Sequence, residues 1–266
     1  MNAPDPQAAL AGEAPSILSK AFDLLRSFNT DNRVMTLSEL SRASGLPKST
    51  VHRLIARLID LGAVEQHRSG YAISLDVGQM ASTTPAAGMR DNALPYLAAL
   101  HRWSGLSVQL AVLRHFDVVY LEILKRHDVV APRAGVGGHL HAHCMAVGKA
   151  LLSWENLDDL ESFLPRPLPK LTAQSISDVD DLVIELRKVR GEGLAYEHDE
   201  SQPGLSAVAA PIIIHDYAVG AVSLTAASET AINLRAENAL RQTAAEIARV
   251  CREDLADRKH LFPHPI

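Results

Sequence analysis

The stretch GLPKSTVHRLIARLIDLGAVE, residues 45–65, decides the fold of the first part of the chain. Four of its apolar residues recur at the spacing of a helix that buries one face: Val51, Leu54, Ile55 and Leu58. Pro47 stands where a first helical residue would be, and Gly62 follows the last apolar residue, Leu61. Proline at the start and glycine just past the end are typical of helix boundaries. The sequence therefore predicts an amphipathic helix from Pro47 to about Leu61.

The residues on either side of this helix complete a compact motif. A helical pattern begins at Ser16 and ends near Phe28, and Thr36 with Glu39 predicts a capping box for a second helix that Gly45 ends. Two short strands, 63–66 and 71–74, are predicted around the turn Arg68–Gly70. Three helices followed by a hairpin are the outline of a winged helix-turn-helix, a DNA-binding motif.

The polar face of the third helix suits DNA. Four basic residues and no acidic one lie between Arg42 and Arg57. Arg53 is suited to a guanine edge, and Lys48 with the Ser49 and Thr50 hydroxyls to phosphate or base. A solvated surface helix or an ordinary polar turn would carry similar residues, but the surrounding motif favours DNA recognition. The candidate DNA-binding residues are Thr36, Arg42, Lys48, Ser49, Thr50, His52, Arg53, Arg57, His67 and Arg68.

Length and charge separate this part from the rest. A chain of 266 residues, 47% hydrophobic and 21% charged, is long enough for about two globular domains. The net charge of −5 disfavours a protein that coats nucleic acid, but residues 1–90 carry a net +1 and residues 91–266 a net −6. The first fifteen residues are predicted to be a disordered tail and not a signal peptide, and no apolar run is long enough to span a membrane. A cytoplasmic protein is expected.

The second part is predicted to be an α+β domain with a mostly antiparallel sheet. Residues 76–92 are polar and contain glycine and proline, which predicts a linker. The predicted helices are 91–103, 146–154, 179–190 and a closing helix from Thr230 past Cys251. The predicted strands are 106–114, 118–125, 207–214 and 218–226. Runs of strands with helices set apart from them are typical of this fold class.

A histidine-rich loop offers the main alternative, an enzyme or a metal sensor. His139, His141 and His143 alternate, so on a strand they would share one face, with Cys144 adjacent. Imidazole and thiolate groups at this spacing are possible zinc ligands of a metal- or thiol-dependent enzyme. No carboxylate completes a hydrolase-like cluster in the loop, and hydrogen-bonded loop histidines are the simpler interpretation.

Other motifs of catalysis or cofactor binding are weak. The glycines of the segment 135–138 lack the spacing and the Lys-Ser/Thr of a phosphate-binding loop, and Ser153 is not in a Gly-x-Ser-x-Gly turn. The two cysteines, Cys144 and Cys251, are too few for a four-cysteine zinc site or a disulfide framework. We therefore expect no enzymatic activity, no cofactor and no bound metal.

The chain resembles the IclR family of bacterial transcriptional regulators. The resemblance is carried by residues 45–65, by YAISLDVGQM at 71–80, VGKALLS at 147–153, and GLSAVAAPI and GAVSLT from Gly204 to Thr225. It implies a winged helix-turn-helix, a linker helix and a GAF-like effector-binding domain. It also implies a homodimer or homotetramer that binds palindromic promoter DNA. The expected mode of regulation is repression. The winged helix-turn-helix is expected over 16–76, the linker and linker helix over 77–103, and the effector-binding domain over 104–258. Residues 1–15 and 259–266 are expected to be tails.

The resemblance also places a small-molecule effector against the sheet of the second domain. By position, its contacts correspond to His143, Cys144, Met145, Ala146, Val147, Glu197, Ala207, Ser223 and Thr225. Two departures matter: this loop reads His141-Ala142-His143-Cys144, and Ala207 stands where cysteine is frequent in the family. The acidic Glu197 disfavours a bare dicarboxylate. We therefore expect an uncharged or weakly charged aromatic or acyl effector that carries N–H or O–H donors.

Overall fold

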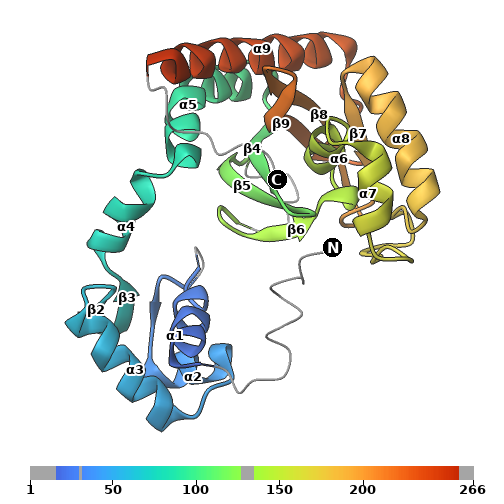
Figure 1. Ribbon diagram of the computed structural model, residues 1–266. Coiled ribbons are helices and arrows are strands. Elements are labelled where there is room, and N and C mark those ends of the chain that lie inside the picture. The colour runs from blue at the N-terminus through green and yellow to red at the C-terminus, as the bar shows by residue number, and fades with distance from the viewer. Residues whose placement is uncertain (1–15, 30–31, 127–134, 258–266) are drawn as a thin grey trace, which may run out of the picture. The chain divides into compact units, whose positions relative to one another are not determined.

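The computed structural model describes residues 16–29, 32–126 and 135–257, and the chain divides into two compact units, Met1–Thr83 and Thr84–Ile266 (Figure 1). The tails expected at 1–15 and 259–266 lie outside the described residues. Within the described part of the chain, none of the helices is both long and apolar enough to cross a membrane. Each unit has its own hydrophobic core, and we describe them in turn.

The first unit contains the predicted helices and hairpin. Its elements are α1 (Ile17–Arg26), β1 (Val34–Met35), α2 (Leu37–Ser44), α3 (Lys48–Asp60), β2 (Val64–His67), β3 (Gly70–Ile73) and α4 (Leu75–Ser82). β3 lies between β1 and β2 in an antiparallel three-stranded sheet. Gly70 allows this close pairing, because a Cβ at that position would collide with the Met35 carbonyl. The winged helix-turn-helix is therefore confirmed, with one short additional strand, β1.

Local sequence signals account for the helix boundaries in this unit. The capping box at α2 is confirmed: the Thr36 hydroxyl accepts the Glu39 N–H at 3.3 Å, and the Glu39 carboxylate accepts the Thr36 N–H at 2.8 Å. Gly45 ends α2 with a φ of +69°, which favours glycine. Pro47 caps α3 rather than being its first residue. All four residues of the predicted apolar stripe of α3 are buried.

The second unit is built on a six-stranded sheet. Its strands are β4 (Ser107–Arg114), β5 (Asp117–Leu124), β6 (His139–His141), β7 (Ala195–His198), β8 (Leu205–Ile214) and β9 (Tyr217–Ala227). They lie in the order β6-β5-β4-β9-β8-β7, and each pair of neighbours is antiparallel. Its helices are α5 (Pro85–Ser104), α6 (Ala146–Leu152), α7 (Leu157–Phe163), α8 (Val179–Glu192) and α9 (Leu234–Asp257). The α+β class is confirmed.

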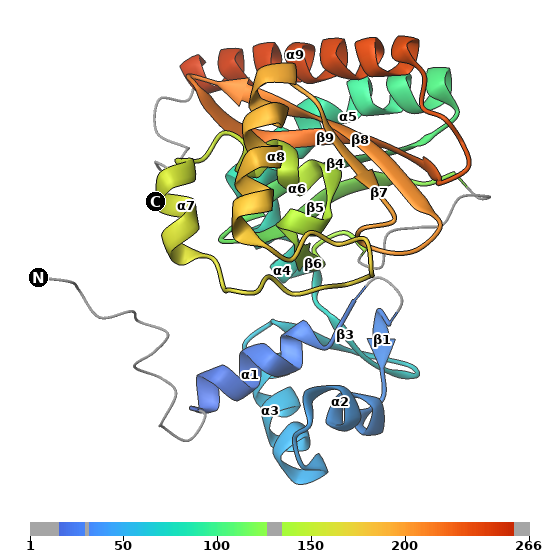
Figure 2. The ribbon, with the colours of Figure 1, turned by 90° about the vertical axis from the view of Figure 1, so that its right-hand side faces the viewer.

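Helices cover both faces of this sheet. Leu97 of α5 and Ile247 of α9 are fully buried in one apolar cluster with Val222 and Leu224 of β9. Residues of α6 and α8 form a second cluster with Ala111, Ala207 and Ala221 on the other face. Figure 2 shows α5 and α9 running above the sheet, and α6, α7 and α8 on its other side. Each strand side chain therefore packs either against α5 and α9 or against α6 and α8, depending on the face to which it points.

The stretch 76–92, expected to be a linker because it contains glycine and proline, is mostly helical. Residues 75–82 form α4, and α5 begins at Pro85, after Thr84 caps it. Proline is tolerated in the first turn of a helix, so Pro85 marks a helix start and not a break. Met89 and Ala93 of α5 are buried in the core of the second unit. The helix that begins at Pro85 therefore packs on the core of the second unit.

Candidate functional site

Two sets of polar residues stand out, and the first lies on α3. Ser49, His52, Arg53 and Arg57 are exposed on the side of α3 opposite its buried stripe, and Lys48 is exposed at its first turn. We call these five residues the α3 surface. Arg57 forms an exposed ion pair with Asp60 at 3.7 Å. Such a pair contributes no more than about 1 kcal/mol, so the guanidinium remains available to a polyanion.

The other predicted DNA contacts surround the α3 surface within the same unit. Arg42 is exposed in the last turn of α2, and His67 and Arg68 are exposed at the tip of the β2–β3 hairpin. His67 Nδ1 lies 3.2 Å from the Ser69 hydroxyl. The Thr36 hydroxyl donates to the Glu39 carboxylate at 2.9 Å. Thr36 is therefore engaged in helix capping, while the cations are exposed to solvent.

The second set lies on the sheet face that α6 covers, which we call the α6 face. Three predicted residues form one row across the strands there, because Thr225 of β9 pairs with Ala207 of β8, and Ala207 with Glu197 of β7. Residues that pair directly across strands present their side chains to the same face. Ser223 is two residues from Thr225 on β9, so it shares this face. All four are buried.

Glu197 contributes a carboxyl group to this face from the edge strand β7. It is 1% exposed. Its Oε2 accepts the Ala146 N–H at 3.1 Å, and its Oε1 accepts the Ser201 N–H at 3.2 Å and the Ser201 hydroxyl. Burial raises the pKa of Glu197 to about 7, because these hydrogen bonds only partly offset the loss of water. The carboxyl is thus poised to gain or lose a proton near neutral pH.

The loop before α6 is also buried, but two of its side chains contact the segment around Pro169 and not the sheet. His143 donates from Nε2 to the Pro169 carbonyl at 2.8 Å, and Cys144 Sγ lies 3.9 Å from the same oxygen. Burial lowers the pKa of His143 and raises that of the Cys144 thiol, so both groups favour the neutral form. Met145 and Val147 are buried beside them. The structure therefore brings the loop to the α6 face while His143 and Cys144 face the segment around Pro169.

The structure corrects the idea of three histidines on one strand. His139 and His141 belong to β6, but His143 lies in a 3₁₀ turn over Ala142–Cys144. His141 Nδ1 contacts Asp117 Oδ1 at 3.2 Å, and its ring stacks on that of His143 at 5.8 Å between centroids. Among the described residues, no group of three His, Cys, Asp or Glu side chains is arranged to hold a metal ion.

Two buried polar residues on or near the α6 face were not predicted. Gln109 of β4 is 1% exposed, and its Oε1 accepts the Ser223 and Thr225 hydroxyls at 2.5 and 2.8 Å. Lys149 of α6 is 2% exposed, and its ammonium donates to the Glu200 carboxylate at 2.8 and 3.1 Å. A lone glutamine within the apolar strand SVQLAVL was the available signal for the first residue.

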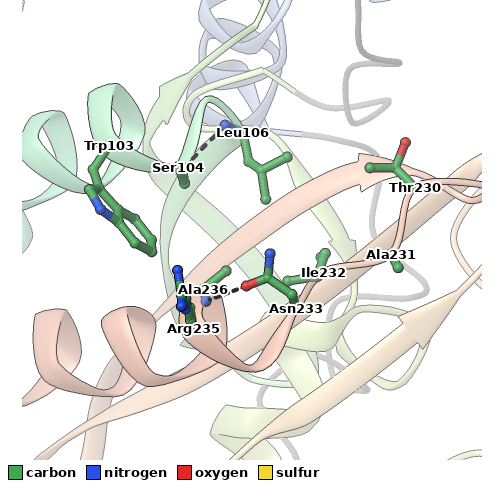
Figure 3. Close-up of a pocket in the computed structure, with 9 residues that line it drawn as sticks. All are labelled: Trp103, Ser104, Leu106, Thr230, Ala231, Ile232, Asn233, Arg235 and Ala236. Atoms are coloured by element: carbon green, nitrogen blue, oxygen red, sulfur yellow. Dashed lines mark hydrogen bonds between the residues drawn. The ribbon is translucent and has the colours of Figure 1, made fainter.

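A pocket of about 450 Å³ lies elsewhere in the second unit, on the side of α5 and α9 (Figure 3). It is lined by Trp103, Ser104, Leu106, Thr230, Ala231, Ile232, Asn233, Arg235 and Ala236. Figure 3 shows Trp103 and Arg235 on the side of the pocket where α5 ends and α9 begins. Because Leu106, Ile232 and Ala236 pack with the α5–α9 cluster, the pocket is separate from the α6 face.

Comparison with known proteins identifies both units. Residues 17–68 match the IclR helix-turn-helix domain, and residues 81–252 match the bacterial transcriptional regulator IclR C-terminal family. An HTH-type transcriptional regulator of Mycobacterium tuberculosis is 31% identical over 203 residues, which cover 73% of this chain and 75% of the relative. The glycerol operon regulatory protein of Streptomyces coelicolor is 29% identical over 218 residues, which cover 80% and 85%.

A solved structure shares the whole architecture. The IclR homologue from Microbacterium hydrocarbonoxydans, crystallised with 4-hydroxybenzoate, superposes with a TM-score of 0.79 at 26% identity and covers 90% of this chain and 100% of that one. The Mycobacterium and Streptomyces relatives are named as regulators and not as enzymes. The winged helix-turn-helix, the covered sheet and these matches together show that the chain belongs to the IclR family of bacterial transcriptional regulators, proteins that bind DNA and respond to small molecules.

Proposed function

We propose that this regulator reads a promoter site with the α3 surface and is controlled by a small organic effector bound at the α6 face. The observation that carries the first part is the division of α3 into a buried stripe and an exposed face with Ser49, His52, Arg53 and Arg57. A helix of this kind presents donors to base edges in the major groove. Acting on bacterial DNA places the protein in the cytoplasm.

We assign different tasks to the predicted DNA-binding residues of the first unit. Arg53 lies in the middle of α3, where a guanidinium can bind a guanine edge in bidentate fashion. Lys48, Ser49 and Thr50 lie in the first turn and hold phosphate, because the start of a helix favours anions and the Lys48 ammonium and the two hydroxyls can donate to phosphate oxygens. Arg42, His67 and Arg68 contact the DNA backbone on either side. Thr36 acts indirectly, since its side chain holds the start of α2.

For the effector we propose a weakly charged aromatic or acyl compound. Glu197, Ser223 and Thr225 would hold its polar groups, and Met145, Ala146, Val147 and Ala207 would pack against its apolar part. His143 and Cys144 support the loop through the Pro169 carbonyl. The 4-hydroxybenzoate bound by the Microbacterium homologue is a compound of this class and makes it a suitable first probe.

We further propose that the protein acts as a homodimer or homotetramer on a palindromic site, as a repressor that the effector releases. Two recognition helices must match the helical repeat of DNA, so half-sites lie about 34 Å apart or at a multiple of that distance. An effector that favours one arrangement of the DNA-binding domains would then change DNA affinity. Of the segments expected from the sequence, 16–76 would bind DNA, 104–258 would bind the effector, and 77–103 would connect them.

The experiment that tests this function uses the full chain and the DNA upstream of its own gene. Fluorescence anisotropy should show saturable binding to that DNA, with much weaker binding to a scrambled duplex of the same length. Light scattering of the complex gives the number of subunits. An effector found by thermal-shift screening of small aromatic and short-chain acids and amides should then lower the affinity for DNA. Equal affinity for both duplexes would overturn the proposed recognition.

A further inference from the structure

Gln109 occupies an unusual environment on the α6 face. Both hydroxyls that contact it, Ser223 and Thr225, donate to the same atom, Oε1. This leaves the two N–H donors of Nε2 on the other side of the amide group. Nε2 is buried, and among the described residues it has no hydrogen-bond partner. The two hydroxyls therefore fix the orientation of an amide whose donors are unused.

An unused buried donor is uncommon in a native protein. The great majority of buried polar side-chain atoms have a partner in the protein, in ordered water or in a ligand. The sheet itself does not require a glutamine here, since Ala111, two residues along β4 on the same face, is apolar and pairs in the same ladders. The Gln109 amide is thus a polar group kept inside the domain, and no residue that the structure describes accepts a hydrogen bond from its donors.

The surroundings of this amide belong to the proposed effector site. Gln109 pairs with Ser223, and Ser223 with Ala209, while Glu197 lies in the adjacent row across Ala207. Donors thus stand on the β4 side of the face and an acceptor, the Glu197 carboxylate, stands on the β7 side. Three strand spacings, about 14 Å between backbones, separate β4 from β7. The small side chains of Ala207 and Ala209 lie on β8, between β4 and β7, one in each of the two rows.

We infer that Gln109 is an effector-binding residue that selects compounds with an acceptor oxygen, a carbonyl or a carboxylate, through the N–H donors of its side chain. This inference rests on the proposed function, because it concerns the chemistry of the same site. The buried ammonium of Lys149 is already paired with Glu200 and so does not provide a second contact for that oxygen. An effector with an acceptor at one end and an O–H or N–H donor toward Glu197 would satisfy both sides.

Calorimetric titration of the full chain with three matched phenols tests the inference. 4-Hydroxybenzoate carries a charged acceptor, 4-hydroxyacetophenone carries a neutral carbonyl, and 4-methylphenol carries neither. The wild-type protein should bind at least one of the first two at least tenfold more tightly than 4-methylphenol. Preference for the benzoate would identify a carboxylate as the acceptor, and preference for the ketone would identify a neutral carbonyl.

Two substitutions then assign the preference to the amide. Gln109→Met keeps the length of the side chain and removes the donors, so the tenfold preference should disappear. Gln109→Glu keeps an oxygen for the Ser223 and Thr225 hydroxyls and replaces the donors with an acceptor, so at pH 8 it should disfavour both oxygen-bearing probes. Gln242→Met, at an exposed position of α9, is the matched control and should bind like wild type.

The contrary results are equally definite. The inference is overturned if wild type shows no preference for the oxygen-bearing probes, or if folded Gln109→Met and Gln109→Glu rank the probes as wild type does. Melting curves by circular dichroism establish folding, and either variant alone is sufficient for the comparison. DNA binding measured on the same samples separates the two proposals. If the wild-type protein does not prefer its own upstream DNA to a scrambled duplex, the proposed function is contradicted. The order in which the three phenols bind tests the role of Gln109 alone.

Discussion

The α3 surface and the α6 face use polar residues in opposite ways. On α3 the polar groups are exposed, belong to one helix of thirteen residues and have few partners within the protein. On the α6 face they are buried and come from distant positions, as in the contact between Gln109 and Ser223. Exposed groups can be exchanged with little effect on folding, whereas buried groups are part of the core. The comparison therefore predicts separate phenotypes for the two regions.

The largest expected effect concerns the buried ion pair that ties α6 to the loop after β7. In Lys149→Met, the Glu200 carboxylate loses its ammonium partner while Glu185 remains nearby. Removing one partner of a buried pair destabilises a protein by about 3–5 kcal/mol. Urea denaturation should show a loss of this size in the free energy of unfolding of the second unit.

A double change sharpens this prediction. Adding Glu200→Gln to Lys149→Met removes the uncompensated charge, so part of the lost stability should return. Lys188→Met, at an exposed position of α8, is the matched control and should change the unfolding free energy by less than about 0.5 kcal/mol. If Lys149→Met behaves like this control, the pair does not hold α6 in place.

The second effect is a pH dependence that arises from Glu197. Its pKa of about 7 lies above the ordinary value of 4.5, so the folded protein holds a proton that the unfolded chain releases. The resulting stability is present below about pH 4.5 and is lost as the pH rises through 7. The shift corresponds to about 3 kcal/mol at 1.36 kcal/mol per unit. Denaturation between pH 5 and 8 should therefore show a decline that Glu197→Gln lacks.

The quantity to compare is the slope of the unfolding free energy against pH. The absolute stability is not comparable, because Glu197→Gln places an amide N–H near donors such as the Ser201 N–H and so changes stability at every pH. Glu229→Gln, at an exposed position, should retain the wild-type decline. The same variants test the role in effector binding, for which an anionic probe should bind more weakly as Glu197 loses its proton. Unchanged affinity in Glu197→Gln would remove Glu197 from the effector site.

Sequence patterns predict the first unit well because its signals are local. The stripe of α3, the capping box at Thr36 and the glycine after α2 depend on residues fewer than eight positions apart. The same reasoning missed α4 and the start of α5, because Gly78, Pro85 and Gly88 were interpreted as breakers. Thr84 caps α5 and makes Pro85 compatible with a helix, and packing of Met89 into the core outweighs the cost of Gly88.

The α6 face was less predictable because it depends on strand pairing. Resemblance to the family indicated Glu197, Ser223 and Thr225, but only the antiparallel register brings Gln109 beside the two hydroxyls. Lys149 lies in a stretch matched to the family, yet its partner Glu200 is 51 residues away. Pairing at such separations leaves no periodic signal, so these contacts require the fold to be known.

A third effect concerns Arg53 on the α3 surface. Arg53→Ala removes a donor pair proposed to bind a guanine edge, so affinity for the operator should fall by about 1–3 kcal/mol while binding to unrelated DNA changes little. Electrophoretic mobility shifts with operator and scrambled duplexes measure both. The unfolding free energy should stay within about 0.5 kcal/mol of wild type, because Arg53 is exposed. Arg187→Ala on α8 is the matched control.

The smallest effect separates phosphate contacts from base contacts within the α3 surface. Lys48→Ala should weaken binding to operator and scrambled DNA by the same factor, because phosphate is present in every sequence. The slope of log K against log salt concentration should decrease in magnitude by about 1, as expected for one lost phosphate contact. Titrations at several salt concentrations, with Lys188→Ala as the exposed control, measure this slope. A change in operator preference with an unaltered slope would instead place Lys48 at a base and reverse the proposed roles of Lys48 and Arg53.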